Sequence, residues 1–254
     1  MGFPDMKVTG IIPARMGSSR FPGKPLALIA GKPMIEHVYR RSAMCRALDV
    51  LVVATPDEEI ATAVRAFDGD VVMTSSEHER ATDRVAEAAR ITGGDIVIVI
   101  QGDEPLLSPE MIEAAVAPVA ADERVFCSNL VERISSVEEF RNPNTIKVIM
   151  DRHHNALYFS RAPVPSIERL GFARIHAYKQ VCIIPFRHEN LVKFTTLSPT
   201  ELERVESIDM LRILEHGYTV RLVESPGVSY AVDVPEDIAV VEQAMERDAL
   251  CARY

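Results

Sequence analysis

Short apolar runs rich in Val and Ile alternate with amphipathic segments through the first hundred residues, and this alternation constrains the fold more than any other feature. The first run opens at Val8, and later runs cover residues 50–54, 70–73 and 95–100. The segments between them have helical length and lie at residues 34–46, 56–67 and 82–91. An unbroken apolar run is typical of a strand buried on both faces, and parallel neighbours need crossover connections. The pattern therefore predicts an α/β fold with a mostly parallel, doubly wound sheet.

The second half of the chain predicts a mixed sheet. No long helix separates its extended runs, which lie at residues 125–131, 145–150, 156–160 and 178–186. Such spacing favours antiparallel neighbours. The remaining expected elements are a helix at residues 200–214, a strand at 220–223 and a terminal helix ending near residue 247. We expect one domain over residues 7–254, with residues 1–6 as a disordered leader.

A loop rich in Gly, Ser, Pro and cations directly follows the first apolar run. Its candidate ligand-binding residues are Arg15, Gly17, Ser18, Ser19, Arg20, Gly23 and Lys24. Ligands of open α/β sheets bind at the carboxyl ends of the strands, and Arg, Lys and backbone N–H groups suit phosphate oxygens. The loop is not a Walker A motif, because Lys24 is followed by Pro25 rather than Ser or Thr. It predicts a polyphosphate cradle, and the alternative is a solvated basic loop.

Acidic residues follow the run at 95–100. Asp103 and Glu104 come after Gln101 and Gly102, and Asp233 stands just before the terminal helix. Mg²⁺ in proteins is usually held by one or two carboxylates together with substrate phosphates. Asp103 and Glu104 are therefore candidates for a magnesium site, and we expect folding to bring Asp233 opposite Asp103. The alternative is an ordinary Gly-Asp turn with Glu104 as a solvated acid.

Composition excludes several classes of function. The 254-residue chain has a formal net charge of −9, which argues against a nucleic-acid or membrane-surface role because both need positive potential. No apolar run approaches the roughly 18 residues of a membrane span, and residues 1–5 do not resemble a signal peptide, so a cytoplasmic location is expected. The four Cys are widely spaced, which favours reduced thiols over a zinc site.

Several short motifs, taken in order over nearly the whole chain, resemble the 3-deoxy-D-manno-octulosonate (Kdo) cytidylyltransferase family. They lie at residues 13–15 (Pro-Ala-Arg), 19–26 (Ser-Arg-Phe-Pro-Gly-Lys-Pro-Leu), 31–35 (Gly-Lys-Pro-Met-Ile), 101–105 (Gln-Gly-Asp-Glu-Pro), 142–144 (Asn-Pro-Asn), 147–148 (Lys-Val), 156–161 (Ala-Leu-Tyr-Phe-Ser-Arg) and 232–237 (Val-Asp-Val-Pro-Glu-Asp). The resemblance implies a GT-A-like nucleotidyltransferase fold and a homodimer. It also implies that CTP and Kdo are converted with Mg²⁺ into CMP-Kdo and pyrophosphate, for lipopolysaccharide or capsule synthesis.

The same resemblance implies roles for individual residues. Those matched to the CTP site are Arg15, Ser18, Ser19, Arg20, Lys24, His78, Thr82, Arg84 and Gln101. Those matched to the magnesium site are Asp103 and Asp233, which with Lys24 form the expected catalytic set. Those assigned to the sugar are Ser160, Arg161, Gln180, Ile184, Glu203, Glu206 and Arg212. Glu203 and Glu206 lie three residues apart on one helical face, where they either bind sugar hydroxyls or form a solvated face.

Two departures from the family pattern bear on specificity. Arg80 and Ala81 replace a small Ser-Gly pair beside the cytidine site, between His78 and Thr82. Gln180 stands where a His is common, and Ile184 stands where a Tyr is common. An amino-Kdo or another 2-keto-3-deoxy sugar acid therefore stays open as the substrate.

Two other classes stay open from the residues alone. A GT-A glycosyltransferase would be expected to carry Asp-x-Asp where this chain has Gln-Gly-Asp-Glu at residues 101–104. A non-catalytic nucleotide-binding module has no need for two separated metal carboxylates, and the chain has both Asp103 and Asp233.

Overall fold

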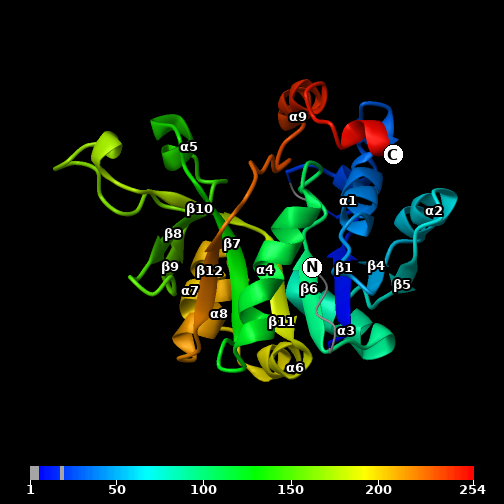
Figure 1. The fold of residues 1–254 in the computed structure, drawn as a ribbon, viewed down its shortest axis with the longest axis horizontal. Coiled ribbons are helices and arrows are strands. Elements are labelled where there is room, and N and C mark those ends of the chain that lie inside the picture. Colours follow the sequence, from blue (N-terminus) through cyan, green and yellow to red (C-terminus); the bar gives the residue numbers. More distant parts are fainter. Residues whose placement is uncertain (1–5, 18–19) are drawn as a thin grey trace.

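The structure is a computed structural model that describes residues 6–17 and 20–254. Within these residues one sheet contains ten strands, in the order β5-β4-β1-β6-β11-β7-β10-β8-β9, with β12 paired to β7 (Figure 1). Residues 1–5 of the expected leader lie outside the described part of the chain.

The first half of the sheet is parallel, as the alternating pattern predicts. Its strands are β1 (Val8–Pro13), β4 (Val50–Thr55), β5 (Val71–Met73) and β6 (Ile96–Ile100), and every ladder among them is parallel. The helices of this half are α1 (Met34–Ala43), α2 (Glu58–Ala66) and α3 (Ala81–Thr92). After β1 come a short 3-10 helix, Lys24–Leu26, and a hairpin of β2 (Leu28–Ile29) and β3 (Lys32–Pro33).

The second half is mixed, which confirms the other part of the fold prediction. Its strands are β7 (Cys127–Arg133), β8 (Lys147–Met150), β9 (Ala156–Ser160), β10 (Tyr178–Val181), β11 (Ile183–Arg187) and β12 (Val220–Glu224). The ladder of β12 with β7 is parallel, and β11 joins the halves by antiparallel pairing with β6. The segment between β9 and β10 extends from the body of the molecule at the left of Figure 1.

Three expectations about elements are wrong in detail. The run at residues 178–186 is two strands, which separate at Cys182. The helix at residues 200–214 is two helices, α7 (Glu201–Glu206) and α8 (Asp209–Glu215), because Ser207 adopts a left-handed conformation with φ of 56°. The pattern also missed α5 (Val137–Arg141) and α6 (His188–Thr196), which bury few side chains.

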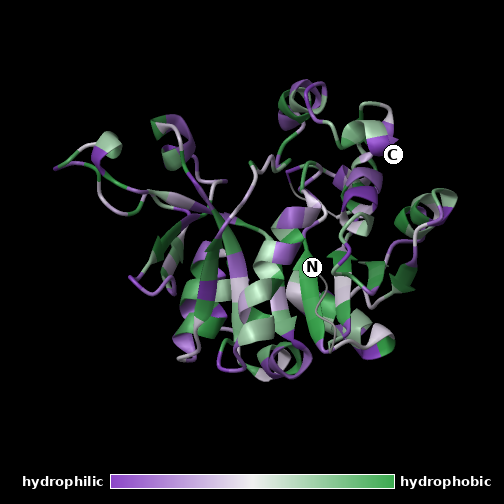
Figure 2. Cartoon of the chain, in the orientation of Figure 1, coloured by the Kyte–Doolittle hydropathy of each residue, from purple (hydrophilic) through white to green (hydrophobic). Residues whose placement is uncertain are grey.

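Helices cover both faces of the sheet. Successive residues of a strand point to opposite faces, so Ile11 belongs to the apolar cluster that includes α3, α6 and α8. Ile12 belongs to the cluster that includes α1, α2 and α4 (Pro109–Ala121). Figure 2 shows hydrophobic residues concentrated on the central strands. A smaller apolar cluster joins the terminal helix α9 (Asp237–Met245) to the β2–β3 hairpin. No helix in the described ranges is long and apolar enough to cross a membrane.

This topology gathers four separate segments above the carboxyl ends of the parallel strands. They are the loop after β1, residues 78–84 at the start of α3, the turn after β6 and the segment that leads into α9. Backbone hydrogen bonds hold them in place: Ala14 N donates to Ala54 O of β4 at 2.9 Å, and Val232 N donates to Asp103 O at 2.9 Å, which joins the segment leading into α9 to the turn after β6.

Candidate active site

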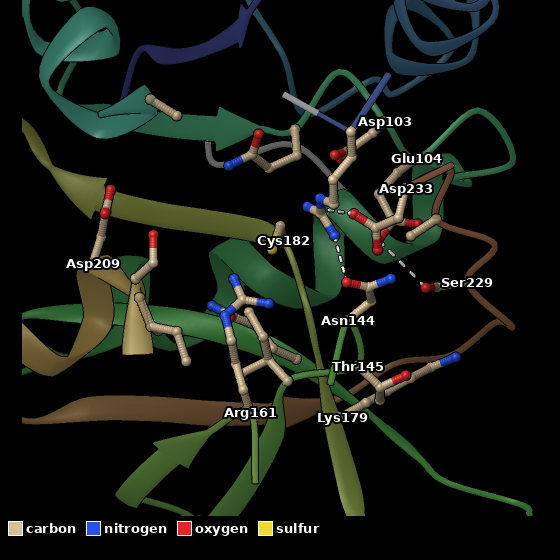
Figure 3. A pocket seen from close by; sticks show the side chains of 18 of the residues that line it. Asp103, Glu104, Asn144, Thr145, Arg161, Lys179, Cys182, Asp209, Ser229 and Asp233 are labelled. Atoms are coloured by element: carbon tan, nitrogen blue, oxygen red, sulfur yellow. Dashed lines mark hydrogen bonds and ion pairs between the residues drawn. The ribbon is translucent and has the colours of Figure 1, made fainter. Parts of the chain in front are cut away.

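Two adjoining hollows occupy this edge of the sheet. The larger cavity has a volume of about 600 Å³ and is lined from both halves of the sheet, and the smaller hollow has about 360 Å³. They share a wall that includes Arg15, Arg20, Arg80 and Asp103. Figure 3 shows side chains from widely separated parts of the chain converging on a single cavity.

The smaller hollow is cationic. Its lining includes Arg15, Arg20, Lys24, His78 and Arg84. These residues come from the loop after β1 and the segment entering α3, so the hollow brings together most of the residues matched to CTP. Ser18 and Ser19 of the same expectation lie outside the described residues.

Arg84 is buried and shapes the wall of the smaller hollow. Its guanidinium donates to Thr74 Oγ1 at 2.6 Å and to Ser75 O at 3.0 Å. Burial lowers the pKa of Arg84, and the nearby charge of Arg15 lowers it further. His78 contacts Glu87 of α3, with Nε2 2.5 Å from Oε2, and its carbonyl oxygen accepts from Arg84 Nη2 at 3.3 Å. Arg84 therefore adds positive potential while holding the segment that carries His78.

An acidic pair stands where the two hollows meet. Lys24 Nζ lies 2.8 Å from Asp103 Oδ2, and Arg20 Nη2 lies 2.8 Å from Asp233 Oδ1. Lys24 also donates to Val232 O at 2.9 Å, which joins the loop after β1 to the segment carrying Asp233. Burial raises the pKa of Asp233, and the charge of Asp103 raises it further, while Arg20 and Lys24 oppose the rise. The structure thus brings together the two carboxylates that are 130 positions apart in the sequence.

Glu104, which the sequence offered with Asp103 as a magnesium carboxylate or as a solvated acid, adds a third carboxyl group beside this pair; its burial is inconsistent with a solvated acid. Its side chain is buried, and Oε1 accepts a long hydrogen bond of 3.4 Å from Ser229 Oγ. Burial, together with the charge of Asp103, raises the pKa of Glu104 to about 8.

The larger cavity contains three of the residues assigned to the sugar. Arg161 donates from Nε to Glu206 O at 2.7 Å and from Nη1 to Pro143 O at 3.1 Å, and Nη2 has no hydrogen-bond partner within residues 6–17 and 20–254. Figure 3 shows its guanidinium directed into the cavity. Gln180 Nε2 donates to Asn129 Oδ1 at 2.6 Å. Ile184 also lines the cavity, so it shares the site with Gln180 although a strand break separates them.

Four other residues assigned to the sugar line neither hollow: Ser160, Glu203, Glu206 and Arg212. Arg212 Nη2 and Nε lie 2.6 and 2.8 Å from the two carboxylate oxygens of Glu203, and both side chains are almost fully buried. Glu206 accepts from Ser160 Oγ at 3.0 Å and from Arg161 N at 2.7 Å. The turn at Ser207 brings α8 beside α7, so that Arg212 reaches Glu203. The four residues thus pair with one another outside the lining of the two hollows.

Sequence reasoning missed several residues of the site. Arg80 lines both hollows and donates to Ser207 Oγ at 2.9 Å. Asp209 accepts from Thr82 Oγ1 at 2.8 Å, and burial raises the pKa of its carboxyl group. Arg80 was visible as a departure from the family pattern, whereas Asp209 had no sequence signal, because only the turn at Ser207 places it opposite Thr82.

An open α/β sheet with a cationic loop and an acidic pair at its carboxyl edge defines this protein as a nucleotidyltransferase. In agreement, residues 9–224 match the model of the Cytidylyltransferase family. Two relatives named 3-deoxy-manno-octulosonate cytidylyltransferase cover almost the whole chain. The protein from Syntrophobacter fumaroxidans is 47% identical and covers 97% of this chain and 100% of its own length. That from Geobacter metallireducens is 45% identical and covers 95% of this chain and 99% of its own length.

A solved structure also supports membership of this family. It is described as CMP:2-keto-3-deoxy-manno-octonic acid synthetase complexed with CTP, and it is 36% identical to this chain. The match covers 95% of this chain and 99% of the other, with a TM-score of 0.87. The chain belongs to the 3-deoxy-manno-octulosonate cytidylyltransferase family.

Proposed function

We propose that the protein transfers CMP from CTP to the anomeric hydroxyl of Kdo and releases pyrophosphate. The observation that carries this proposal is the position of the Lys24–Asp103 and Arg20–Asp233 pairs at the junction of the two hollows. Fixed charges at such a junction position two bound substrates and stabilise the charge that develops during nucleotidyl transfer. The near full-length similarity to relatives that bear the name of this activity supports the choice of nucleotide and sugar acid.

The cations of the smaller hollow suit the triphosphate of CTP. Arg15, Arg20 and Lys24 offer guanidinium and ammonium donors that match phosphate oxygens. Negative charge builds on the leaving pyrophosphate during transfer, so fixed positive charge there lowers the barrier. Lys24 is held by Asp103 and Val232 O, which makes it a preorganised donor.

Asp103 and Asp233 fit a magnesium ion. Their mutual repulsion contributes to the raised pKa of Asp233, and a divalent cation between them would relieve it. The described residues contain no group of three His, Cys, Asp or Glu side chains suited to a metal, so phosphate oxygens and water would complete the coordination. When bound, Mg²⁺ would neutralise developing phosphate charge and orient the reacting groups.

The transfer needs no covalent enzyme intermediate. The anomeric oxygen of the sugar forms a bond to the α-phosphorus, the bond from that phosphorus to the pyrophosphate oxygen breaks, and the hydroxyl proton leaves to water. Arg15, Arg20 and Lys24 hold the phosphates, while the acidic pair fixes Arg20 and Lys24 at the reacting centre.

The larger cavity suits an anionic sugar. Arg161 presents Nη2 to it, whereas Lys179 is already neutralised by Glu139, 2.8 Å from its Nζ, and by Glu132 at 3.5 Å. Arg161 is therefore the better partner for the sugar carboxylate. Because the Gln180 amide is bonded to Asn129 and Ile184 offers no hydroxyl, a second 2-keto-3-deoxy sugar acid such as an amino-Kdo stays a candidate substrate.

The decisive experiment measures pyrophosphate release from CTP with a panel of eight- and nine-carbon keto-sugar acids. We expect turnover with Kdo, abolished by EDTA and restored by excess Mg²⁺. Cleavage of a ready-made sugar nucleotide without use of CTP would identify a glycosyltransferase instead. Binding of CTP without turnover of any panel member would identify a nucleotide-binding module.

The family resemblance supports three further proposals: a homodimer, a cytoplasmic location, and supply of CMP-Kdo to lipopolysaccharide or capsule synthesis. Nucleic acid and anionic membrane surfaces are not expected as partners, since the net charge of −9 disfavours both.

A further inference from the structure

A buried lysine outside the predicted site residues connects two segments that line the larger cavity. Lys147 is the first residue of β8 and its side chain is fully buried. Its Nζ donates to Asn142 O at 2.8 Å, to Thr145 O at 2.6 Å and to Arg161 O at 2.5 Å. An ammonium group has three protons, so all its hydrogen-bonding capacity is directed at these three carbonyls.

The first connected segment is the turn at residues 142–145. Asn144 N donates to Asn142 Oδ1 at 2.9 Å, which closes the turn. Asn144 Oδ1 accepts from Arg20 Nη1 at 2.6 Å, and the same guanidinium pairs with Asp233. Figure 3 shows Asn144 reaching from this turn toward the acidic pair. The turn therefore supports the position of Arg20 at the reacting centre.

The second connected segment begins at Arg161, directly after β9. Lys147 holds the carbonyl of Arg161, and the Arg161 guanidinium donates to Pro143 O in the turn. The main chain of Arg161 is thus linked to the turn through Lys147, and its side chain is linked to the turn directly. The guanidinium remains directed into the cavity (Figure 3).

We propose that Lys147 is a positioning residue for the sugar acid, because its ammonium group sets the distance between the 142–145 turn and Arg161 on which the sugar site depends. This inference rests on the proposed function and adds a residue to its sugar subsite. Burying an ammonium group is costly, and apolar replacements of buried charges are often as stable. Stability alone therefore does not explain why a lysine is buried at position 147. Its three hydrogen-bond acceptors all belong to segments that line the cavity, and a positioning role explains this.

The test compares Lys147→Met with wild type and with Lys193→Met. Met keeps the approximate length of the side chain and removes the donors, and Lys193 is an exposed lysine of α6 that lines neither hollow. We expect Lys147→Met to raise the KM for the sugar acid by about 10- to 100-fold, the usual effect of a misplaced binding group. The Kd for CTP without sugar should change by less than about threefold, because Arg20 keeps its ion pair with Asp233 when the turn carrying Asn144 loosens. Lys193→Met should change neither value.

A second readout does not depend on turnover. Hydrogen exchange at residues 142–146 of the ligand-free protein should become faster in Lys147→Met, while exchange in β1 and β6 stays unchanged. Asn142→Ala removes the side chain that closes the turn from an exposed position, so it should fold and raise the sugar KM in the same direction. If Lys147→Met fails to fold, the sugar KM of Asn142→Ala tests whether the turn positions the sugar acid.

The outcomes separate the two proposals. Wild-type protein that releases no pyrophosphate with any sugar acid defeats the proposed function, and hydrogen exchange then decides whether Lys147 orders the turn. Active wild type with an unchanged sugar KM in Lys147→Met, or in Asn142→Ala if the first variant does not fold, overturns the positioning role. Equal losses of CTP affinity and sugar KM would also overturn it, since they indicate a general structural effect.

Discussion

In the proposed function, individual charges at the junction of the two hollows carry the chemistry, and substitution of the acidic pair tests this most directly. Asp103→Asn and Asp233→Asn should each lower kcat by at least about 10- to 100-fold, because Asn keeps the shape and loses the charge that would hold Mg²⁺. Asp122→Asn, at an exposed ion pair with Arg124, is the matched control and should keep full activity. Circular dichroism checks the fold, and near-normal kcat of either site variant at saturating Mg²⁺ would contradict the metal assignment.

A second comparison at the residue scale separates two lysines of one segment. Lys24 contacts Asp103 and Val232 O, whereas Lys32 belongs to β3 and lines neither hollow. Lys24→Ala should weaken CTP binding by about tenfold or more, as expected for loss of a charge-assisted contact, and Lys32→Ala should have little effect. Titration of CTP into both variants measures this. Equal effects would mean that the loop after β1 does not hold the triphosphate.

At the scale of elements, the break between α7 and α8 allows Arg212 to pair with Glu203, which the sequence assigned to the sugar. Glu203→Ala should destabilise the protein by roughly 3 to 5 kcal/mol, since it leaves Arg212 buried without its partner. The KM for the sugar acid should change little, because Glu203 lines neither hollow. Urea unfolding and steady-state kinetics measure the two effects. A large rise in sugar KM without loss of stability would restore Glu203 as a sugar ligand.

The junction of β10 and β11 tests specificity for the sugar acid. Gln180 and Ile184 lie on separate strands and both line the cavity. A missing polar partner for a buried hydroxyl costs about 1 to 3 kcal/mol, so unmodified Kdo should be used less efficiently than some variant keto-sugar acid. Gln180→His with Ile184→Tyr should shift preference toward Kdo in kcat/KM across the panel. Wild type that already prefers Kdo above every other member would refute this specificity argument.

At the scale of the whole molecule, the proposed homodimer predicts a solution mass of twice that of one chain, measured by light scattering coupled to gel filtration. The dimer should persist at the concentration used for kinetic assays. A fully active monomer under those conditions would rule out dependence of the site on a partner subunit.

The amino-acid sequence by itself determined the α/β class, the parallel first half, the mixed second half and the positions of the cationic loop and acidic residues. These features depend on local information, namely apolar runs, turn residues and charges that stand at strand ends. The family motifs then identified the reaction class, because their order extends over nearly the whole chain.

Only the tertiary structure decided which of these residues meet. The turn at the left-handed residue Ser207 placed Arg212 of α8 against Glu203 and Asp209 against Thr82. The proposed positioning role of Lys147 depends on its hydrogen bonds to carbonyls of the 142–145 turn and of Arg161. A helical or strand period gives the spacing of side chains along one element, but their partners depend on how distant segments pack, which no local pattern encodes.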